Sequence, residues 1–161
     1  MRADGGVSFL IRELGDGERD RPMLSWRWRV DAAPPATDLG VKGADDRALA
    51  IHVWYPPAEG TATFSQRLTR LFGYPAPGFA LTYVWGGAAA AGSVVTNPYM
   101  EAGRLIVLRP SGTPQGQWFD EQVDPAADFA PRLWRRSRRP ARVHRYFLRL
   151  RRHRIAGGRS R

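Results

Sequence analysis

The chain has 161 residues, of which 43% are hydrophobic and 25% charged, as expected of a single globular domain, and its formal net charge is +10. It has no cysteine, which excludes disulfides, iron–sulfur sites and thiol nucleophiles. The 17 glycines and 13 prolines favour many short strands over long helices, and no apolar run has the length of an export signal or a membrane-spanning helix.

Alternation of apolar and polar residues marks the first part of the chain. After a predicted strand at residues 7–13, the run at residues 24–30 places Trp26 and Trp28 on one side and polar residues on the other. Two tryptophans on one face would bury a large apolar surface. A second alternating run, residues 49–55, is ended by two prolines. Both runs predict half-buried strands whose bulky side chains line one shared interior.

An acidic pair, Asp45 and Asp46, stands just before the second of these strands. Adjacent carboxylates at such a place could ligate a hard cation or supply acid–base groups. The other interpretation, which we favour, is a structural turn that leads into the strand and is helped by Gly43. Asp120 and Glu121 form a second pair, but neighbours on a strand point to opposite faces, so these two cannot serve one site.

The remaining predicted elements are short. Apolar residues at helical spacing predict one short helix at residues 63–72. Further strands are predicted at residues 81–85, 105–108 and 117–123, and Asp124 followed by a proline predicts the start of a helix. Six or so short strands with little helix indicate an all-β fold, namely an incomplete antiparallel β-sandwich or jelly roll.

Several short segments occur in the order in which the bacterial DUF3047 family has them. They lie at residues 24–30, 42–46, 49–55, 83–86, 97–99, 105–108 and 116–118, with Glu121 and residues 128–129. Over residues 7–130 the chain thus resembles this family, which has no assigned function. Family members look longer at the N-terminus and often carry an export signal. The resemblance therefore implies a fragment of a sandwich domain from a periplasmic protein.

The charge pattern changes sharply after residue 130. Residues 1–130 hold 12 basic and 15 acidic residues, whereas residues 131–161 hold 13 arginines and no acid, so net charges of −3 and +13 make up the +10. The favoured interpretation is a shifted reading frame in a GC-rich gene, because the tail lacks lysine and the family resemblance stops before it. We therefore expect a partial sandwich domain at 1–130 and, at 131–161, a disordered or helical tail that is not native to it.

Two functional interpretations of this tail remain open. Arginine clusters bind phosphate groups, so the tail could be a nucleic-acid arm, and an amphipathic helix with arginines could lie on a membrane surface. The candidate nucleic-acid contacts are Arg135, Arg136, Arg138 and Arg139.

Three functions follow from these features. The first, which we favour, is a non-catalytic, envelope-associated β-sandwich protein without an assigned ligand. A glycan is one candidate ligand, because exposed tryptophans on a sandwich face can stack on sugars, with Trp54 and Trp85 as the contacts. Core packing is the interpretation that we favour for the tryptophans as a group. The second is a hydrolase that uses Asp45, Asp46 and Glu121. The third is nucleic-acid binding through the tail. No motif for a cofactor, a nucleotide or a metal ion is recognisable.

Overall fold

The computed structural model describes residues 11–55, 78–133 and 147–152, and these form two layers of β-structure. The larger layer is a six-stranded sheet of order β1-β8-β3-β4-β6-β5, and the smaller is the antiparallel pair β2-β7. The elements are β1 (Ile11–Glu13), α1 (Asp16–Arg19), β2 (Leu24–Trp28), β3 (Leu49–Tyr55), β4 (Phe79–Trp85), β5 (Val94–Thr96), β6 (Gly103–Arg109), β7 (Phe119–Val123), α3 (Pro125–Leu133) and β8 (Phe147–Arg152).

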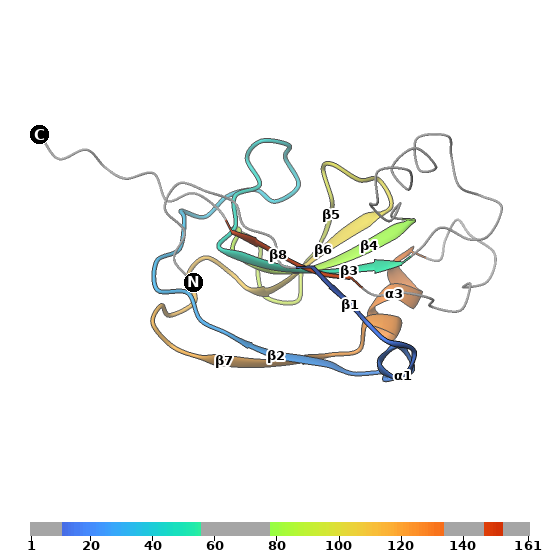
Figure 1. The fold of residues 1–161 in the computed structure, drawn as a ribbon. Helices are drawn as coiled ribbons and strands as arrows, with labels where there is room; N and C mark the ends of the chain where they lie inside the picture. Colours follow the sequence, from blue (N-terminus) through green and yellow to red (C-terminus); the bar gives the residue numbers. More distant parts are fainter. Residues whose placement is uncertain (1–10, 56–77, 134–146, 153–161) are drawn as a thin grey trace, which may run out of the picture.

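Figure 1 shows β2 and β7 running beneath the larger sheet, with α3 at one end of the space between the layers. This arrangement confirms the predicted all-β sandwich. The chain enters α3 as predicted: the backbone N–H groups of Ala126 and Ala127 donate to Asp124 Oδ1 at 3.0 and 2.9 Å, which satisfies two donors of the first helical turn. No helix in the described ranges is both long and apolar enough to cross a bilayer.

The interior between the layers is built from the alternating residues of β3 and β4. Their antiparallel register sets Ile51 opposite Tyr83 and Val53 opposite Leu81, so these side chains share one face. The buried cluster comprises Val53, Tyr55, Leu81, Tyr83 and Ile106, and Leu24, Trp26, Val123 and Phe129 pack against it from β2, β7 and α3. The predicted shared interior of the two alternating runs is therefore confirmed.

Three tryptophans extend this interior towards one end of the sandwich. The rings of Trp26 and Trp28 meet edge-to-face with centroids 5.4 Å apart, and those of Trp28 and Trp85 with centroids 5.6 Å apart. Phe119 of β7 adds a further edge-to-face contact to Trp85 at 5.3 Å. Edge-to-face pairs suit the quadrupoles of aromatic rings, so this cluster combines large buried area with favourable geometry.

The opposite face of the large sheet is also buried around its central strands. Leu39, from the loop before β3, lies against Ala50, Val84, Leu105 and Val107. Gly87 permits this close approach, because its φ is +85° and an added Cβ would lie 2.6 Å from Leu39 Cγ and Cδ1. The strands β3, β4 and β6 are thus largely buried on both faces, unlike the half-buried β2.

Three features of the large sheet differ from an antiparallel sandwich predicted from pattern alone. The strands β4 and β6 are parallel, because the chain crosses to the edge strand β5 before it returns as β6 between β5 and β4. The edge strand β5 has only three residues, too few for alternation to be recognised, and it was not predicted.

The strand β8 is the third difference, because it lies in the tail that we expected to be disordered or helical. It pairs antiparallel with β1 on one side and β3 on the other, with Leu150 opposite Ile51. The sequence Leu-Arg-Leu-Arg at residues 148–151 alternates with period two, which favours a strand. For residues 147–152 the expectation of disorder or helix is therefore wrong. The helix predicted at residues 63–72 lies outside the described residues.

Candidate functional site

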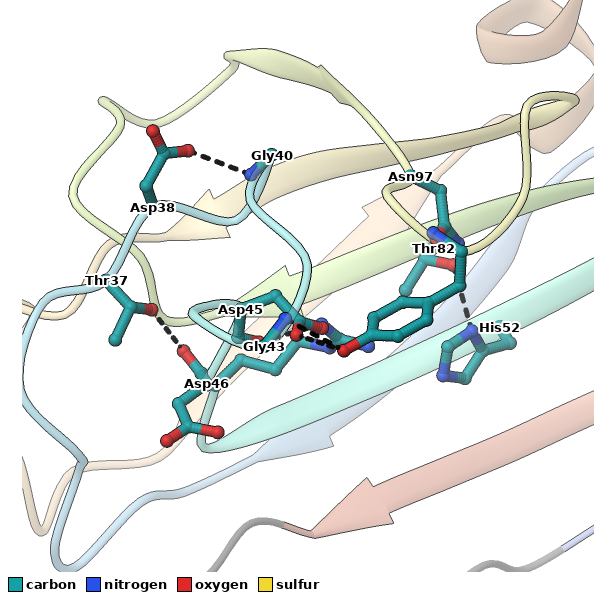
Figure 2. A network of polar contacts seen from close by, with 11 residues as sticks. Thr37, Asp38, Gly40, Gly43, Asp45, Asp46, His52, Thr82 and Asn97 are labelled. Atoms are coloured by element: carbon teal, nitrogen blue, oxygen red, sulfur yellow. Dashed lines mark hydrogen bonds and ion pairs between the residues drawn. The ribbon is translucent and has the colours of Figure 1, made fainter.

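The loop before β3 is closed by short-range hydrogen bonds (Figure 2). The Gly40 N–H donates to Asp38 Oδ1 at 2.9 Å, and the Thr37 hydroxyl donates to the Asp46 carbonyl oxygen at 2.6 Å. Gly43 has a φ of +84°, in the left-handed region that favours glycine. Short side chains that hydrogen-bond to nearby backbone groups, together with a glycine in the left-handed region, are typical of such turns.

The Asp45 carboxylate lies at the centre of this loop in a buried ion pair. Asp45 is 4% exposed and Arg47 is 3% exposed, and Arg47 Nη1 lies 2.8 Å from Asp45 Oδ2. The Tyr99 hydroxyl donates to Asp45 Oδ1 at 2.8 Å and accepts from the Gly43 N–H at 3.1 Å. Tyr99 thereby connects this loop to the turn between β5 and β6.

These partners decide the protonation of Asp45. Burial by itself disfavours the carboxylate and would raise its pKa, but hydrogen bonds from Tyr99 and Arg47 and the guanidinium charge outweigh burial. The pKa of Asp45 therefore lies below its ordinary value of 3.8. A carboxylate that is charged and already accepts from two side chains suits a structural role, which supports the turn interpretation over acid–base chemistry.

This carboxylate should make stability depend on pH in acid. Because the pKa of Asp45 is lower in the folded than in the unfolded chain, its contribution is complete above the unfolded value and is lost as pH falls through the folded value. We expect the free energy of unfolding of Asp45→Asn to fall less steeply between about pH 4 and pH 2 than that of the wild type. Urea unfolding at several pH values measures this; equal slopes would contradict the assignment.

His52 shares a face of β3 with Ala50, which packs against Leu39. Figure 2 shows His52 beside Thr82. Its Nδ1 is 2.9 Å from the Thr82 hydroxyl oxygen, and both side chains are buried. Among the described residues, no three side chains of His, Asp or Glu come together as a metal site would require. The contact of His52 with Thr82 is thus a polar link between β3 and β4.

The side chains of the second carboxylate pair, Asp120 and Glu121, point to opposite faces of β7, as predicted. Glu121 Oε1 accepts from Trp28 Nε1 at 2.8 Å and from Arg109 Nε at 2.7 Å, on the inner side of β7. Asp120 points the other way and pairs with Arg27. The Asp45 and Glu121 carboxylates occupy different clusters, and no described contact joins them. The hydrolase that would use Asp45, Asp46 and Glu121 therefore remains a prediction.

The two tryptophans proposed as glycan contacts have different positions. Trp85 is 0% exposed and enclosed by Trp28 and Phe119, so its assignment as a surface ligand contact is wrong. Its odd-numbered position on β4 shares the inner face with Tyr83, which explains the burial. Trp54 is half-buried on the other face of β3, and its role in binding stays a prediction. The arginines from Arg135 to Arg139 lie outside the described residues.

A different tryptophan is exposed, on the outer side of the smaller sheet. Trp118 is 57% exposed, the most of any large hydrophobic residue in the described ranges. It immediately precedes β7, and the guanidinium carbons of Arg27 and Arg29 each lie 5.6 Å from its ring centroid. We call the exposed surface around this ring the Trp118 face; its residues are Ser25, Arg27, Arg29, Trp118, Asp120 and Gln122.

The position of Trp118 could have been recognised from the sequence. In the strand predicted at residues 117–123, the alternation that turns Phe119 and Glu121 inward turns Trp118 outward, together with Asp120. The neighbouring strand contributes the arginines in the same way, because β2 presents Arg27 on the side opposite Trp28. The signal was present, but it emerges only when the alternations of β2 and β7 are combined.

Together these observations define an all-β sandwich protein with an aromatic and cationic outer face. Residues 1–145 match the DUF3047 family, which is described as a protein of unknown function. Because this match spans most of the chain, the protein belongs to the DUF3047 family. The match includes residues 131–145, which the charge pattern assigns to the tail. Neither the curated proteins nor the solved structures contain a match to the chain.

Proposed function

We propose that this protein is a non-catalytic glycan-binding module whose contact surface is the Trp118 face. The observation that carries the proposal is a single tryptophan left 57% exposed on a sheet face that otherwise presents polar side chains. Exposing an indole ring to water is unfavourable, whereas a ring of this size can cover the C–H face of a sugar. Serine, glutamine, aspartate and arginine around the ring supply hydrogen-bond partners for hydroxyl groups.

The setting of the ring supports binding rather than accidental exposure. Arg27 pairs with Asp120 across the two strands at 2.7 Å, and Arg29 pairs with Asp31 at 2.8 Å. The first pair lies within β2 and β7, which are more rigid than a loop, and the second lies just after β2, so both hold polar groups beside the ring. The aromatic cluster of Trp26, Trp28 and Trp85 lies directly on the inner side of the same sheet. An envelope location remains a prediction from the family resemblance.

Replacing Trp118 by alanine should abolish binding without unfolding the protein. The wild type is first tested against β-glucan, mannan, polygalacturonate and peptidoglycan by affinity electrophoresis or pull-down. For each polymer that the wild type binds, we expect the alanine variant to lose at least tenfold in affinity, about 1.4 kcal/mol. Trp118→Phe should keep most of the affinity, because a flat aromatic ring remains. Circular dichroism should give the same spectrum for all variants.

Met23→Ala is the matched control, because Met23 is another exposed large side chain, 45% exposed, at the opposite end of β2. Its affinity should stay within twofold of the wild type. The proposal fails if the wild type binds no member of the panel, or if Trp118→Ala binds as well as the wild type.

A further inference from the structure

The Trp118 face holds more hydrogen-bond donors than acceptors, and this difference indicates a class of ligand. Each of its two arginines is held by an aspartate through the Nε side of the guanidinium group. Arg27 Nε contacts Asp120 Oδ1 at 2.7 Å, and Arg29 contacts Asp31 through Nε at 2.8 Å and through Nη2 at 3.1 Å.

Both guanidinium groups lie beside the Trp118 ring, but within the part of the chain that the structure describes their remaining nitrogens have no hydrogen-bond or ion-pair partner. They are Nη1 and Nη2 of Arg27 and Nη1 of Arg29, and the exposed indole N–H of Trp118 is a further donor. The Oδ1 atoms of Asp120 and Asp31 lie against the Nε groups of Arg27 and Arg29. The aspartates thus position the guanidinium groups, and what they leave for a ligand is a set of donors next to an aromatic ring.

We infer that the ligand is an acidic glycan, in which a sugar ring lies on Trp118 and a carboxylate of the same chain accepts from Arg27 or Arg29. This inference rests on the proposed glycan-binding function. Two parallel N–H groups match the two oxygens of a carboxylate, which a neutral hydroxyl cannot reproduce. The arginine–aspartate pairs are exposed, with side-chain exposures of 63% and 73% for Arg27 and Asp120. Such exposed pairs contribute little stability, so a ligand carboxylate can share the guanidinium groups at small cost.

Charge distribution favours a glycan over a nucleic acid as the polyanion. Two arginines and two aspartates leave the immediate surroundings of the ring without net charge, and residues 1–130 carry a net charge of −3. Nucleic-acid surfaces instead present many cations along the phosphate chain. A polymer with one carboxylate per sugar needs hydrogen-bond donors at only one place on the protein surface, and the Trp118 face provides them.

The test compares two polymers that differ only in the carboxylate. Polygalacturonate and its fully methyl-esterified form have the same sugar backbone, and affinity is measured by isothermal titration at about 50 mM and 300 mM salt. We expect at least tenfold tighter binding of the acidic form at low salt, with a smaller preference at high salt. Arg27→Met and Arg29→Met should each weaken binding of the acidic form about tenfold and change binding of the ester less than twofold.

Two further variants separate hydrogen-bond geometry from charge. Arg27→Lys keeps the charge but loses the planar pair of donors, so its affinity for polygalacturonate should lie between those of the wild type and Arg27→Met. Asp120→Asn leaves Arg27 in place and removes a negative charge, so it should bind the acidic polymer at least as well as the wild type.

The outcomes distinguish this inference from the proposed function. Equal affinity for the two polymers, both lost in Trp118→Ala, would overturn the acidic ligand and keep the glycan module. No binding of either polymer by the wild type would overturn the acidic ligand, while the broader polysaccharide panel decides the glycan module separately. Tighter binding of a single-stranded thymidine decamer than of polygalacturonate, dependent on Trp118 and Arg27, would overturn both in favour of nucleic acid.

Discussion

Arg47→Met is expected to lower the free energy of unfolding by about 3–5 kcal/mol, because it leaves the buried Asp45 carboxylate without its cation. Among the residues that the structure describes, Asp45 and Arg47 are two of the few buried polar ones, at 4% and 3% exposure. Asp45 would keep only the hydroxyl of Tyr99 as a side-chain partner among the described contacts. Urea unfolding followed by circular dichroism measures the change.

Two comparisons isolate the effect of burial. Arg27→Met removes a similar arginine–aspartate pair at the surface, and we expect it to cost less than about 1 kcal/mol. Replacing both partners, Asp45→Leu together with Arg47→Met, should recover much of the loss, because no uncompensated charge remains in the interior. If Arg47→Met costs no more than Arg27→Met, the buried ion pair is not formed in solution.

The second large effect is expected for Trp85→Ala, which should destabilise the protein by about 3–5 kcal/mol. Trp85 is fully buried and contacts Trp28 and Phe119, so its removal leaves a cavity between the two sheets. Thermal and urea unfolding give the size of the loss. Trp118→Ala removes the same kind of side chain from the surface and should change stability by less than about 0.5 kcal/mol.

These two tryptophan variants test fold and function separately. Trp85→Ala should lower stability while any folded fraction still binds glycan, whereas Trp118→Ala should lose binding at unchanged stability. Comparable destabilisation by both substitutions would mean that Trp118 is packed rather than exposed, and the proposed binding surface would then be incorrect.

The sequence was sufficient for the strands in which burial alternates. β2 and β7 lie within their predicted runs, because a half-buried strand displays its two faces directly in the order of residues. Leu49–Tyr55 agrees with the predicted bounds, but this strand is buried on both faces rather than half-buried. The same logic predicted that Asp120 and Glu121 diverge. It failed for β5, whose three residues are too few to show a period.

The candidate site was harder to predict from the sequence, because it depends on contacts between segments that are far apart in the chain. The partnership of Asp45 with Tyr99 joins residues 54 positions apart, and no local pattern indicates it. Trp85 was misassigned because β4 is apolar on both faces, so its inward and outward residues look alike. The prediction for the tail rested on its charge, which does not report on backbone pairing. The strand at residues 147–152 was therefore missed.

The pairing of β2 with β7 has a consequence for folding. Trp28 and Phe119 are register partners, so the smaller sheet joins parts of the chain separated by most of its length. Contacts of such long sequence separation form only after a large loop has closed, which slows folding. Because the Trp118 face needs both strands, it forms late in folding. A partly folded chain would already contain much of the central sheet and yet lack the Trp118 face.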